Sequence, residues 1–370
     1  MRIKITTIVG TRPEIIRLSQ LIQRLDGFLD HRLLHTGQNY EKNLNDIFFE
    51  SMSIRQPDVK IDVNSTSLAN QLGTIFEGVE RELSQNRPDA VLILGDTNSG
   101  LSAIIAKRMG IPVYHIEGGN RSFDINVPEE ANRKIIDHTS DFHLVYSENS
   151  RRNLISEGIP SRQIALIGSP MREVIEAQKT KINSSKILDT LNLTESKYFL
   201  ISLHRQENLN RQERLKEIFN SINKLAAGFQ IPVIVSTHPR VRQIIDSSEI
   251  HFHENVRLMQ PFNFFDYCTL QKNARVVLSD SGSVSEEASV LGFRAITLRD
   301  SMERPEALET GIIMMSGLEF ESIFQCIESI ESFEGNLAGP DEYQIRYSSE
   351  RVLRFILSTI NQHEFWTGKR

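Results

Sequence analysis

Three carboxylates stand at positions where a parallel sheet usually binds ligands. Glu117 follows the apolar run 111–116, Asp96 follows the run 90–94, and Glu129 begins a predicted helix. Because apolar runs of this kind form buried parallel strands, whose carboxyl ends lie at one edge of the sheet, we expect the three acids to gather there. Carboxylates close together raise one another's pKa, which suits them to remove and return a proton near neutral pH. We interpret Asp96, Glu117 and Glu129 as a candidate acid/base group.

A structural alternative exists for part of this group. Acidic residues in the first turn of a helix are stabilised by the helix dipole, and for Glu130 we prefer that explanation. Glu117 differs because it stands between an apolar strand and Gly118-Gly119, where an acid has no obvious structural duty.

Cations are predicted at the same edge. A tight loop, 10–14, joins a strand over 2–9 to a helix over 15–25, a geometry that presents backbone N–H groups to an anion. The spacing of a dinucleotide fingerprint or a P-loop is absent. Arg12 and Arg17 are candidates to bind a phosphate at this loop. For Arg17, a solvated position on the helix is an equally open interpretation. The polar loop that contains Gln38 is a weaker candidate.

The second half of the chain repeats the pattern. His204-Arg205 follows the strand over 198–203 and His238 follows the strand over 232–236. Strand ends of this kind bind ligands in open α/β sheets, so we expect a substrate or leaving-group contact from His204, with His238 in a lesser role.

A loop of small residues follows the strand over 276–279. Ser281, Gly282 and Ser283 allow backbone amides and hydroxyls to approach a phosphate, while an acid one turn into the next helix, at Glu286-Glu287, can bind a ribose diol. The alternative is an ordinary helix start, because Ser followed by Glu three residues later is also a capping box. The segment 299–306, which contains Arg299 and Arg304, offers another cation after the next strand.

These elements predict an α/β protein with two doubly wound domains. Strands and helices alternate through residues 1–170, a polar segment over 179–197 has the composition of a linker, and the alternation restarts at 198. We expect domains over 1–170 and 171–349, with the C-terminal helix of 350–370 packing back across the junction. Two Rossmann-like halves that face each other across a cleft form a GT-B architecture, which binds a nucleotide sugar between its domains.

Composition narrows the class of protein. The chain has 370 residues and a net charge of -6, which argues against nucleic acid as a partner. No apolar run is long enough to span a membrane, and no signal-peptide pattern is present, so we expect a cytosolic protein. Cys268 and Cys326 lack metal-ligand spacing, and we expect both to be buried thiols.

Seven motifs, in order along nearly the whole chain, resemble those of the non-hydrolysing UDP-N-acetylglucosamine 2-epimerases. They are Gly10-Thr11-Arg12-Pro13-Glu14, Gly95-Asp96-Thr97, His115-Ile116-Glu117-Gly118-Gly119, Pro128-Glu129-Glu130-Ala131-Asn132-Arg133, His204-Arg205, Asp280-Ser281-Gly282 with Glu286-Glu287, and Glu303-Arg304-Pro305-Glu306. One such motif would carry little weight, whereas seven in order are specific.

The resemblance implies a reaction and roles for the residues. A base removes the proton from carbon 2 of a UDP-N-acetylhexosamine as UDP leaves carbon 1, and UDP then adds back to the 2-acetamidoglycal as carbon 2 is protonated on the other face. The reaction requires neither a metal nor another cofactor, and family members form homodimers. Matched by position, the resemblance implies an acid/base group of Asp96, Glu117 and Glu129. It implies that His204 and Arg12 steady the diphosphate, that Ser281, Gly282 and Ser283 form the phosphate loop, and that Glu287 binds the ribose. The further substrate contacts are Arg17, Gln38, Arg133, Arg205, His238 and Arg304.

Finer features resemble the subgroup that makes UDP-N-acetyl-L-fucosamine for capsule or O-antigen. They are His35-Thr36-Gly37-Gln38-Asn39-Tyr40, Gly119-Asn120-Arg121, Phe123-Asp124 and Ser236-Thr237-His238-Pro239-Arg240. Arg17 replaces a Lys common in the family, which keeps the charge and changes its geometry. The sequence after Gln38 differs from the pattern of members activated by a second UDP-N-acetylglucosamine, so the resemblance does not extend to that activation.

Three other functions compete with this one. A GT-B glycosyltransferase shares the fold but needs an acceptor and does not explain three acids. A non-catalytic nucleotide-sugar sensor has no need of Asp96, Glu117, Glu129 and His204. An NAD-dependent epimerase is the weakest alternative, because the dinucleotide fingerprint is missing.

Overall fold

The computed structural model describes residues 2–38, 49–63, 67–203, 212–237, 242, 244–245, 251–335 and 337–367. Contacts divide the chain into two units. Unit 1 comprises Met1–Val174 and Ile345–Arg370, and unit 2 comprises Ile175–Gln344. Each unit is built on one parallel sheet, so the α/β class and the two Rossmann-like folds predicted above are confirmed.

The first strand and helix show how the sequence specifies unit 1. β1 (Lys4–Val9) is buried over five of its six residues and ends at a turn. α1 (Arg12–Phe28) begins there with a proline in its first turn and a capping box between Thr11 and Glu14. The helix begins three residues earlier than the apolar periodicity predicts, because the capping box and the proline start it there, and it ends three residues later, at Phe28.

The sheet of unit 1 has seven strands in the order β3-β2-β1-β4-β5-β6-β7, and every pair is parallel. The remaining strands are β2 (Asp30–His35), β3 (Val59–Lys60), β4 (Ala90–Leu94), β5 (Val113–Ile116), β6 (Phe142–Val145) and β7 (Ile164–Leu166). The chain leaves the sheet's centre in one direction through β1, β2 and β3 and in the other through β4 onward. The boundary between β1 and β4 is therefore the topological switch point, where open α/β sheets bind ligands.

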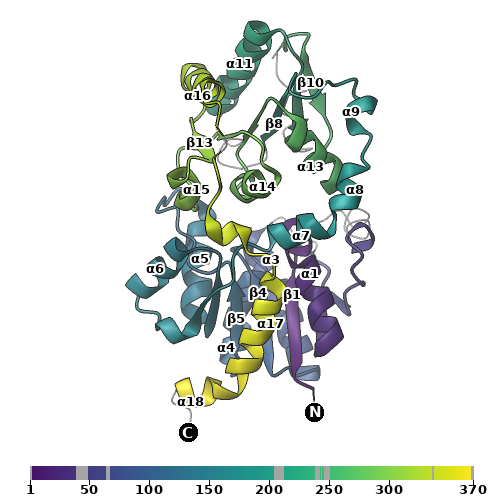
Figure 1. The fold of residues 1–370 in the computed structure, drawn as a ribbon. Helices are drawn as coiled ribbons and strands as arrows, with labels where there is room; N and C mark the ends of the chain where they lie inside the picture. Colours follow the sequence, from purple (N-terminus) through teal and green to yellow (C-terminus); the bar gives the residue numbers. More distant parts are fainter. Residues whose placement is uncertain are drawn as a thin grey trace. The chain divides into compact units, whose positions relative to one another are not determined.

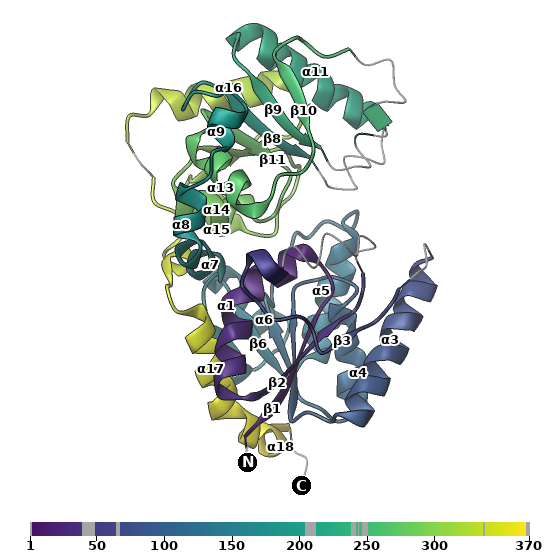
Figure 2. The ribbon, with the colours of Figure 1, turned by 90° about the vertical axis from the view of Figure 1, so that its right-hand side faces the viewer.

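Helices cover both faces of this sheet (Figures 1 and 2). Val91 and Ile93 face α3 (Leu68–Gln85), α4 (Ala103–Arg108) and α5 (Pro128–Thr139), with which they share one apolar core. On the other face α1 lies beside α17 (Ser348–Thr359), which packs against it from the far end of the chain. The helix α6 (Glu148–Ser156) joins β6 to β7.

The C-terminal residues are fixed to unit 1 by polar and aromatic contacts. The Tyr114 hydroxyl lies 2.8 Å from the Thr359 hydroxyl, and His363 lies 2.8 Å from the Asp141 carboxylate. Trp366, in α18 (His363–Thr367), contacts the Phe142 ring, which agrees with a packing role for this tryptophan.

Unit 2 has a parallel sheet of six strands in the order β10-β9-β8-β11-β12-β13. The strands are β8 (Phe199–Leu203), β9 (Val233–Thr237), β10 (Val256–Met259), β11 (Val276–Ser279), β12 (Ala295–Thr297) and β13 (Ile313–Met315). One face packs on α11 (Gln212–Phe229) and α16 (Phe320–Ser332), and the other on α13 (Phe264–Asn273), α14 (Val284–Leu291) and α15 (Pro305–Glu309). Its switch point lies between β8 and β11.

The predicted linker over 179–197 is wrong in part. The segment contains two short helices, α8 (Lys179–Asn183) and α9 (Ile187–Thr190), which follow α7 (Met171–Ala177) and contact α13. Its apolar residues Ile187, Leu188, Leu191 and Leu193 pack against the core of unit 2. Abundant Lys, Ser and Asn mask this apolar content in a composition average, so composition alone indicates a linker where the segment is packed.

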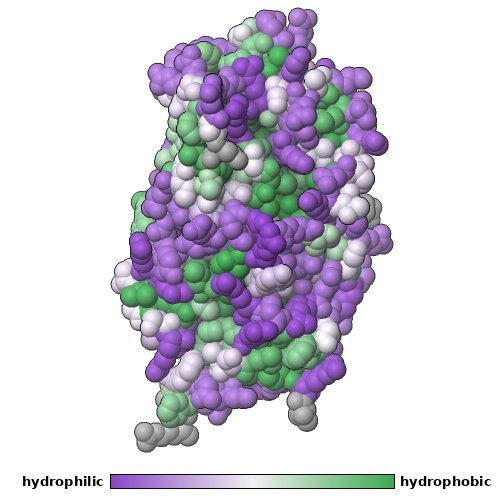
Figure 3. Space-filling view, in the orientation of Figure 1, coloured by the Kyte–Doolittle hydropathy of each residue, from purple (hydrophilic) through white to green (hydrophobic). Residues whose placement is uncertain are grey.

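The surface and core have ordinary character. Hydrophilic side chains cover much of the face in Figure 3, with apolar ones in separate groups. Cys268 and Cys326 are buried, as predicted. Within the described ranges, none of the helices combines the length and the apolar character needed to cross a bilayer.

Candidate active site

Glu117 follows β5 at the carboxyl edge of the first sheet, in a backbone conformation that is costly for a residue with a side chain. Its φ is 70°, in the left-handed region, which costs of the order of 1–3 kcal/mol. The carboxylate is held at both oxygens: Arg17 Nη1 donates to Oε2 at 2.7 Å and Asn120 Nδ2 donates to Oε1 at 3.1 Å. The surrounding structure thus fixes this acid in one orientation.

A buried polar cluster holds the loop that follows Glu117. Asp137, on α5, accepts hydrogen bonds from the Gly119 amide at 3.0 Å and from Arg121 Nη1 at 2.7 Å. His115 Nδ1 lies 2.8 Å from the same carboxylate, and His115 Nε2 donates to the Gly95 carbonyl oxygen at 2.9 Å. Burial alone raises the pKa of Asp137, but the attraction of His115, reinforced by Arg121, holds that pKa well below its ordinary value. The cluster links the ends of β4 and β5 to α5.

Asp96 is held from the same helix. Arg133 Nε donates to Asp96 Oδ2 at 2.8 Å, and Asn132 Nδ2 donates to the Asp96 carbonyl oxygen at 2.9 Å. Arg133 also donates to Glu130 at 2.9 Å. One turn of α5 therefore positions the acid at the end of β4.

The structure brings the three predicted acids to one edge of unit 1. Glu117 lies close to Gly95, the residue before Asp96: a Cβ built on Gly95 would lie 3.5 Å from Glu117 Oε2. Glu129 lies in the first turn of α5, one turn before the residues that hold Asp96; it is half-buried, and no hydrogen bond or ion pair joins it to another described residue.

Glu130 supports the loop before α5. Its carboxylate accepts from the amides of Ser122 and Phe123 and from the Ser122 hydroxyl. Burial opposes ionisation, but these bonds and Arg133 lower the pKa of Glu130 below its ordinary value. Glu130 therefore has a structural role, as expected, although it stabilises a loop as well as a helix end.

The predicted cations and Gln38 occupy different environments. Arg17 is buried, with 7% of its surface exposed, and lies over the Tyr146 ring, so the interpretation of a solvated helix residue is wrong. Arg12 is half-buried at the first residue of α1. Gln38 Oε1 accepts from the Ser99 amide at 3.2 Å and from its hydroxyl at 3.0 Å, and thereby joins the end of β2 to the turn after β4.

Glu14 is a further acid at this edge that strand-end reasoning does not assign. It is 1% exposed, and its two oxygens accept hydrogen bonds from Gly10, Thr11 and Thr97. Burial raises the pKa of Glu14 from its ordinary 4.5 to about 7, against the opposing effect of those hydrogen bonds. The sequence holds one signal for it: Glu14, Leu18, Leu21 and Leu25 share the buried face of α1, so the acid occupies a core position.

In unit 2 the small-residue loop after β11 has its own supports. Arg304 Nη1 donates to the Gly282 carbonyl oxygen at 2.5 Å, and its Nη2 lies 3.1 Å from Glu286. The Ser283 hydroxyl donates to Glu287 Oε1 at 2.9 Å and lies 2.9 Å from the Ser281 hydroxyl. Ser283 is the N-cap of α14 but forms no side-chain cap, so the alternative of a Ser-Glu capping box is wrong.

Three predicted site residues, His204, Arg205 and His238, lie outside the described residues. In the part of the chain that the structure describes, no three His, Cys, Asp or Glu side chains are grouped to hold a metal ion.

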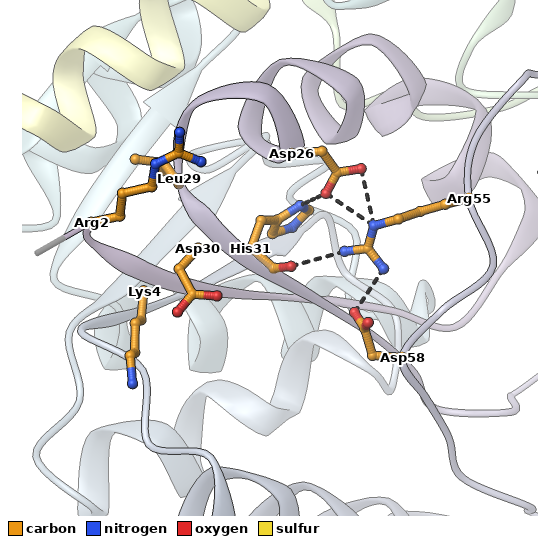
Figure 4. A pocket seen from close by; sticks show the side chains of 8 residues that line it. All are labelled: Arg2, Lys4, Asp26, Leu29, Asp30, His31, Arg55 and Asp58. Atoms are coloured by element: carbon orange, nitrogen blue, oxygen red, sulfur yellow. Dashed lines mark hydrogen bonds and ion pairs between the residues drawn. The ribbon is translucent and has the colours of Figure 1, made fainter.

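A hollow of about 590 Å³ lies at the opposite edge of the sheet of unit 1 (Figure 4). Its lining includes Lys4 and Asp30, which begin β1 and β2, whereas the acids described above follow strand ends. Arg55 crosses the hollow and binds Asp26 at 3.0 Å and Asp58 at 2.7 Å. Because Asp26 and Asp58 are already paired with Arg55, and the three predicted acids lie at the other edge, we place the candidate site at the carboxyl edge.

Comparison with known proteins identifies the family of the chain. The family model described as UDP-N-acetylglucosamine 2-epimerase matches residues 23–361. A structure of UDP-N-acetylglucosamine 2-epimerase from Rickettsia bellii is 42% identical, has a TM-score of 0.92, and 98% of each chain is covered.

Two more relatives extend the comparison. The UDP-N-acetylglucosamine 2-epimerase of Methanocaldococcus jannaschii is 33% identical over 95% of this chain and 98% of its own length. A crystal structure of the M. jannaschii enzyme with UDP-GlcNAc and UDP has a TM-score of 0.89 and covers 96% of this chain and 100% of that one. A UDP-2,3-diacetamido-2,3-dideoxy-D-glucuronate 2-epimerase from Pseudomonas aeruginosa is 30% identical over 87% of this chain and 90% of its length. The chain belongs to the UDP-N-acetylglucosamine 2-epimerase family.

Proposed function

We propose that this protein is an isomerase that inverts carbon 2 of a UDP-N-acetylhexosamine without net hydrolysis. A carboxylate removes the proton from carbon 2, and the electron pair of that bond forms the double bond of a 2-acetamidoglycal as UDP leaves carbon 1. UDP then adds back to carbon 1 while an acid returns a proton to the other face of carbon 2. Atoms and charge balance without a metal or a redox cofactor.

The observation that carries this proposal is the constrained arrangement around Glu117. Proton transfer requires a base held in one orientation, and Glu117 has a left-handed backbone and a carboxylate bonded to Arg17 and Asn120. Asp96, held by Arg133, and Glu129, on α5, supply acids at the same edge. We assign the proton transfers to these three acids together and leave the face of carbon 2 served by each one open.

The remaining roles follow from family membership. Ser281, Gly282 and Ser283 bind the phosphates, Glu287 the ribose, and His204 and Arg12 the departing diphosphate, with Arg17, Gln38, Arg133, Arg205, His238 and Arg304 as further contacts. Fixed cations and amides favour a leaving diphosphate because they meet the charge that develops on it. The hydrogen bonds within the 281–283 loop and from Arg304 support this, because they fix the conformation of the loop before a phosphate arrives.

Two substrates fit the proposal. They are UDP-N-acetylglucosamine, which a relative binds in its crystal structure, and UDP-2-acetamido-2,6-dideoxy-L-talose, which the subgroup motifs favour. With the second sugar the product would be UDP-N-acetyl-L-fucosamine, a precursor of capsule or O-antigen. The proposal includes a cytoplasmic location and a homodimer for the epimerase itself.

The test is product analysis with each sugar alone. Incubation without any acceptor should yield a mixture of the sugar and its carbon-2 epimer, both still linked to UDP. Consumption of the sugar only when an acceptor is added would instead favour a glycosyltransferase, and binding of both sugars without turnover would favour a sensor.

A further inference from the structure

One oxygen of Glu14 is explained by its helix. Oε2 accepts from the Gly10 amide at 2.9 Å, from the Thr11 amide at 2.7 Å and from the Thr11 hydroxyl at 2.8 Å. The bonds to Thr11 belong to a capping box, which fixes the start of α1. Glutamine serves in a capping box as well as glutamate, so this duty does not require a charge.

The other oxygen reaches across the sheet. Oε1 accepts a hydrogen bond from the Thr97 hydroxyl at 2.9 Å. Thr97 is 83 positions away in the sequence and directly follows Asp96. Thr97 lies in the turn after β4, and Glu14 lies after β1, so the bond crosses the switch point of unit 1. The turns are also in close contact here, because a Cβ on Gly10 would lie 2.0 Å from Ser99 Oγ.

Within the described chain, no cation is bonded to the Glu14 carboxylate. The charged or titratable groups on the elements packed around it are Arg12 and Arg17 on α1, His35 at the end of β2, and Asp96, and the Glu14 oxygens bond to none of them there. Glu14 is 1% exposed, and the bonds to its carboxylate come from neutral groups. A buried charge without a cation is costly, and burial accordingly raises the pKa of Glu14 to about 7.

We infer that Glu14 is a positioning residue for carbon-2 epimerisation: its ionised carboxylate fixes the Thr97 hydroxyl and, through it, the turn that carries Asp96. This inference rests on the proposed function, which gives Asp96 its role. An ionised carboxylate only accepts, so the Thr97 hydroxyl must donate to it. A protonated Glu14 must itself donate, and the two backbone amides cannot accept. Oε2 already accepts three hydrogen bonds, two of them from amides, so the proton is placed on Oε1 and is donated to the Thr97 hydroxyl. The Thr97 hydroxyl must then reverse its direction, and the bond that holds Thr97 changes.

The first test compares wild-type enzyme with Glu14→Gln. The amide oxygen accepts from Gly10 and Thr11 while its NH2 group donates to Thr97 Oγ1, so the variant mimics protonated Glu14 and keeps the capping box. We expect UDP binding and KM within about twofold of wild type and kcat lower by about tenfold or more, since small displacements of catalytic groups have effects of this size. The wild-type kcat should fall as pH drops through about 7, and the variant should lack that inflection.

The second test removes the partner. Thr97→Val deletes the hydroxyl and should lower kcat as Glu14→Gln does, while Thr97→Ser keeps the hydroxyl and should retain kcat. Combining Glu14→Gln with Thr97→Val should cause little loss beyond either change, because each one removes the same interaction, the hydrogen bond that the Thr97 hydroxyl donates to Glu14. Glu80→Gln, an exposed acid on α3, is the matched control and should leave kcat unchanged.

The outcomes separate this inference from the proposed function. Wild-type enzyme that does not epimerise any of the tested sugars refutes the function. Active wild-type enzyme with fully active Glu14→Gln, or additive losses in the double variant, refutes the positioning role. If Glu14→Gln fails to fold, the Thr97→Val and Thr97→Ser pair still decides the matter, since equal kcat in the two contradicts a role for the hydroxyl.

Discussion

The Glu117 side chain is held at both oxygens by partners far apart in the sequence or across a tight loop. Arg17, on α1, is 100 positions away, and Asn120 lies in the loop that Asp137 stabilises. Under the proposed function, fixing this carboxylate in advance removes the entropy cost of orienting it during the reaction. The strained backbone of Glu117 is the local cost of this orientation.

Replacing Glu117 by glutamine tests its role as an acid or base. Glutamine fits the same space but cannot accept a proton, so exchange at carbon 2 should fall by about a hundredfold or more while UDP binding persists. The measurement is deuterium incorporation at carbon 2 together with calorimetric UDP binding. Unchanged exchange in Glu117→Gln would remove this residue from the acid/base group.

Glu14 also predicts a dependence of stability on pH. Its native pKa of about 7 exceeds the ordinary 4.5, so the folded state binds more protons than the unfolded chain between those values. The free energy of unfolding should therefore fall as pH rises from 4.5 to 7, and Glu14 should account for roughly 3 kcal/mol of that loss. Glu14→Gln should gain stability relative to wild type over that interval in urea titrations. A difference that does not change with pH would contradict the assigned environment.

At the scale of elements, the turn between β1 and α1 depends on close approach to the turn after β4. A Cβ on Gly10 would lie 2.0 Å from Ser99 Oγ and 2.2 Å from Thr36 Oγ1. Gly10→Ala should lower the free energy of unfolding by about 1–3 kcal/mol or more, because neither side chain can move without losing its hydrogen bond to the other.

The matched control is Gly73→Ala. Gly73 lies inside α3, and apart from its own helix backbone no atom of the described residues lies within 4 Å of the position that an alanine Cβ would occupy. Alanine there should therefore stabilise by about 0.5–1 kcal/mol through helix propensity. Equal effects of the two substitutions would show that the turns are not in close contact.

The C-terminal helix α17 is a structural part of unit 1. Leu353 is 1% exposed and lies on α17, which packs against α1. Leu353→Ala should therefore lower the free energy of unfolding by about 2–5 kcal/mol. The neighbouring Arg354, whose side chain is 77% exposed, gives the control: Arg354→Ala should change stability by about 0.5 kcal/mol or less. Similar effects at both positions in urea denaturation would contradict the packing of α17.

Sequence patterns identify the elements that are encoded locally. The apolar runs before Asp96 and Glu117 specify buried strands, and parallel strands end at one edge, so the location of both acids follows from a few residues each. The helix of 187–190 escapes such patterns because its apolar residues are few and lie among polar ones.

Long-range contacts could not be predicted in the same way. The bond from Glu14 to Thr97 spans 83 positions, and the burial of Arg17 depends on Glu117 and Tyr146, both a hundred residues or more downstream. Local sequence patterns do not indicate which distant residues will come into contact. Sequence therefore indicates which chemistry to expect, and the fold is needed to show which side chains hold the acids in place.

At the scale of the whole molecule, the chain repeats one architecture twice. Each unit has a parallel sheet with a switch point, and chemically suitable residues follow the central strands of both: the acids after β4 and β5 in unit 1 and the small-residue loop after β11 in unit 2. Acids in one unit and a phosphate-type loop in the other fit a reaction that requires both proton transfer at a sugar and binding of UDP.

The central claim is proton exchange at carbon 2, and proton NMR in deuterium oxide tests it most directly. Wild-type protein should be given UDP-N-acetylglucosamine, and separately UDP-2-acetamido-2,6-dideoxy-L-talose, with no acceptor present. The account predicts deuterium at carbon 2 and a mixture of both epimers for at least one sugar. UDP binding with no deuterium incorporated from either sugar would contradict it.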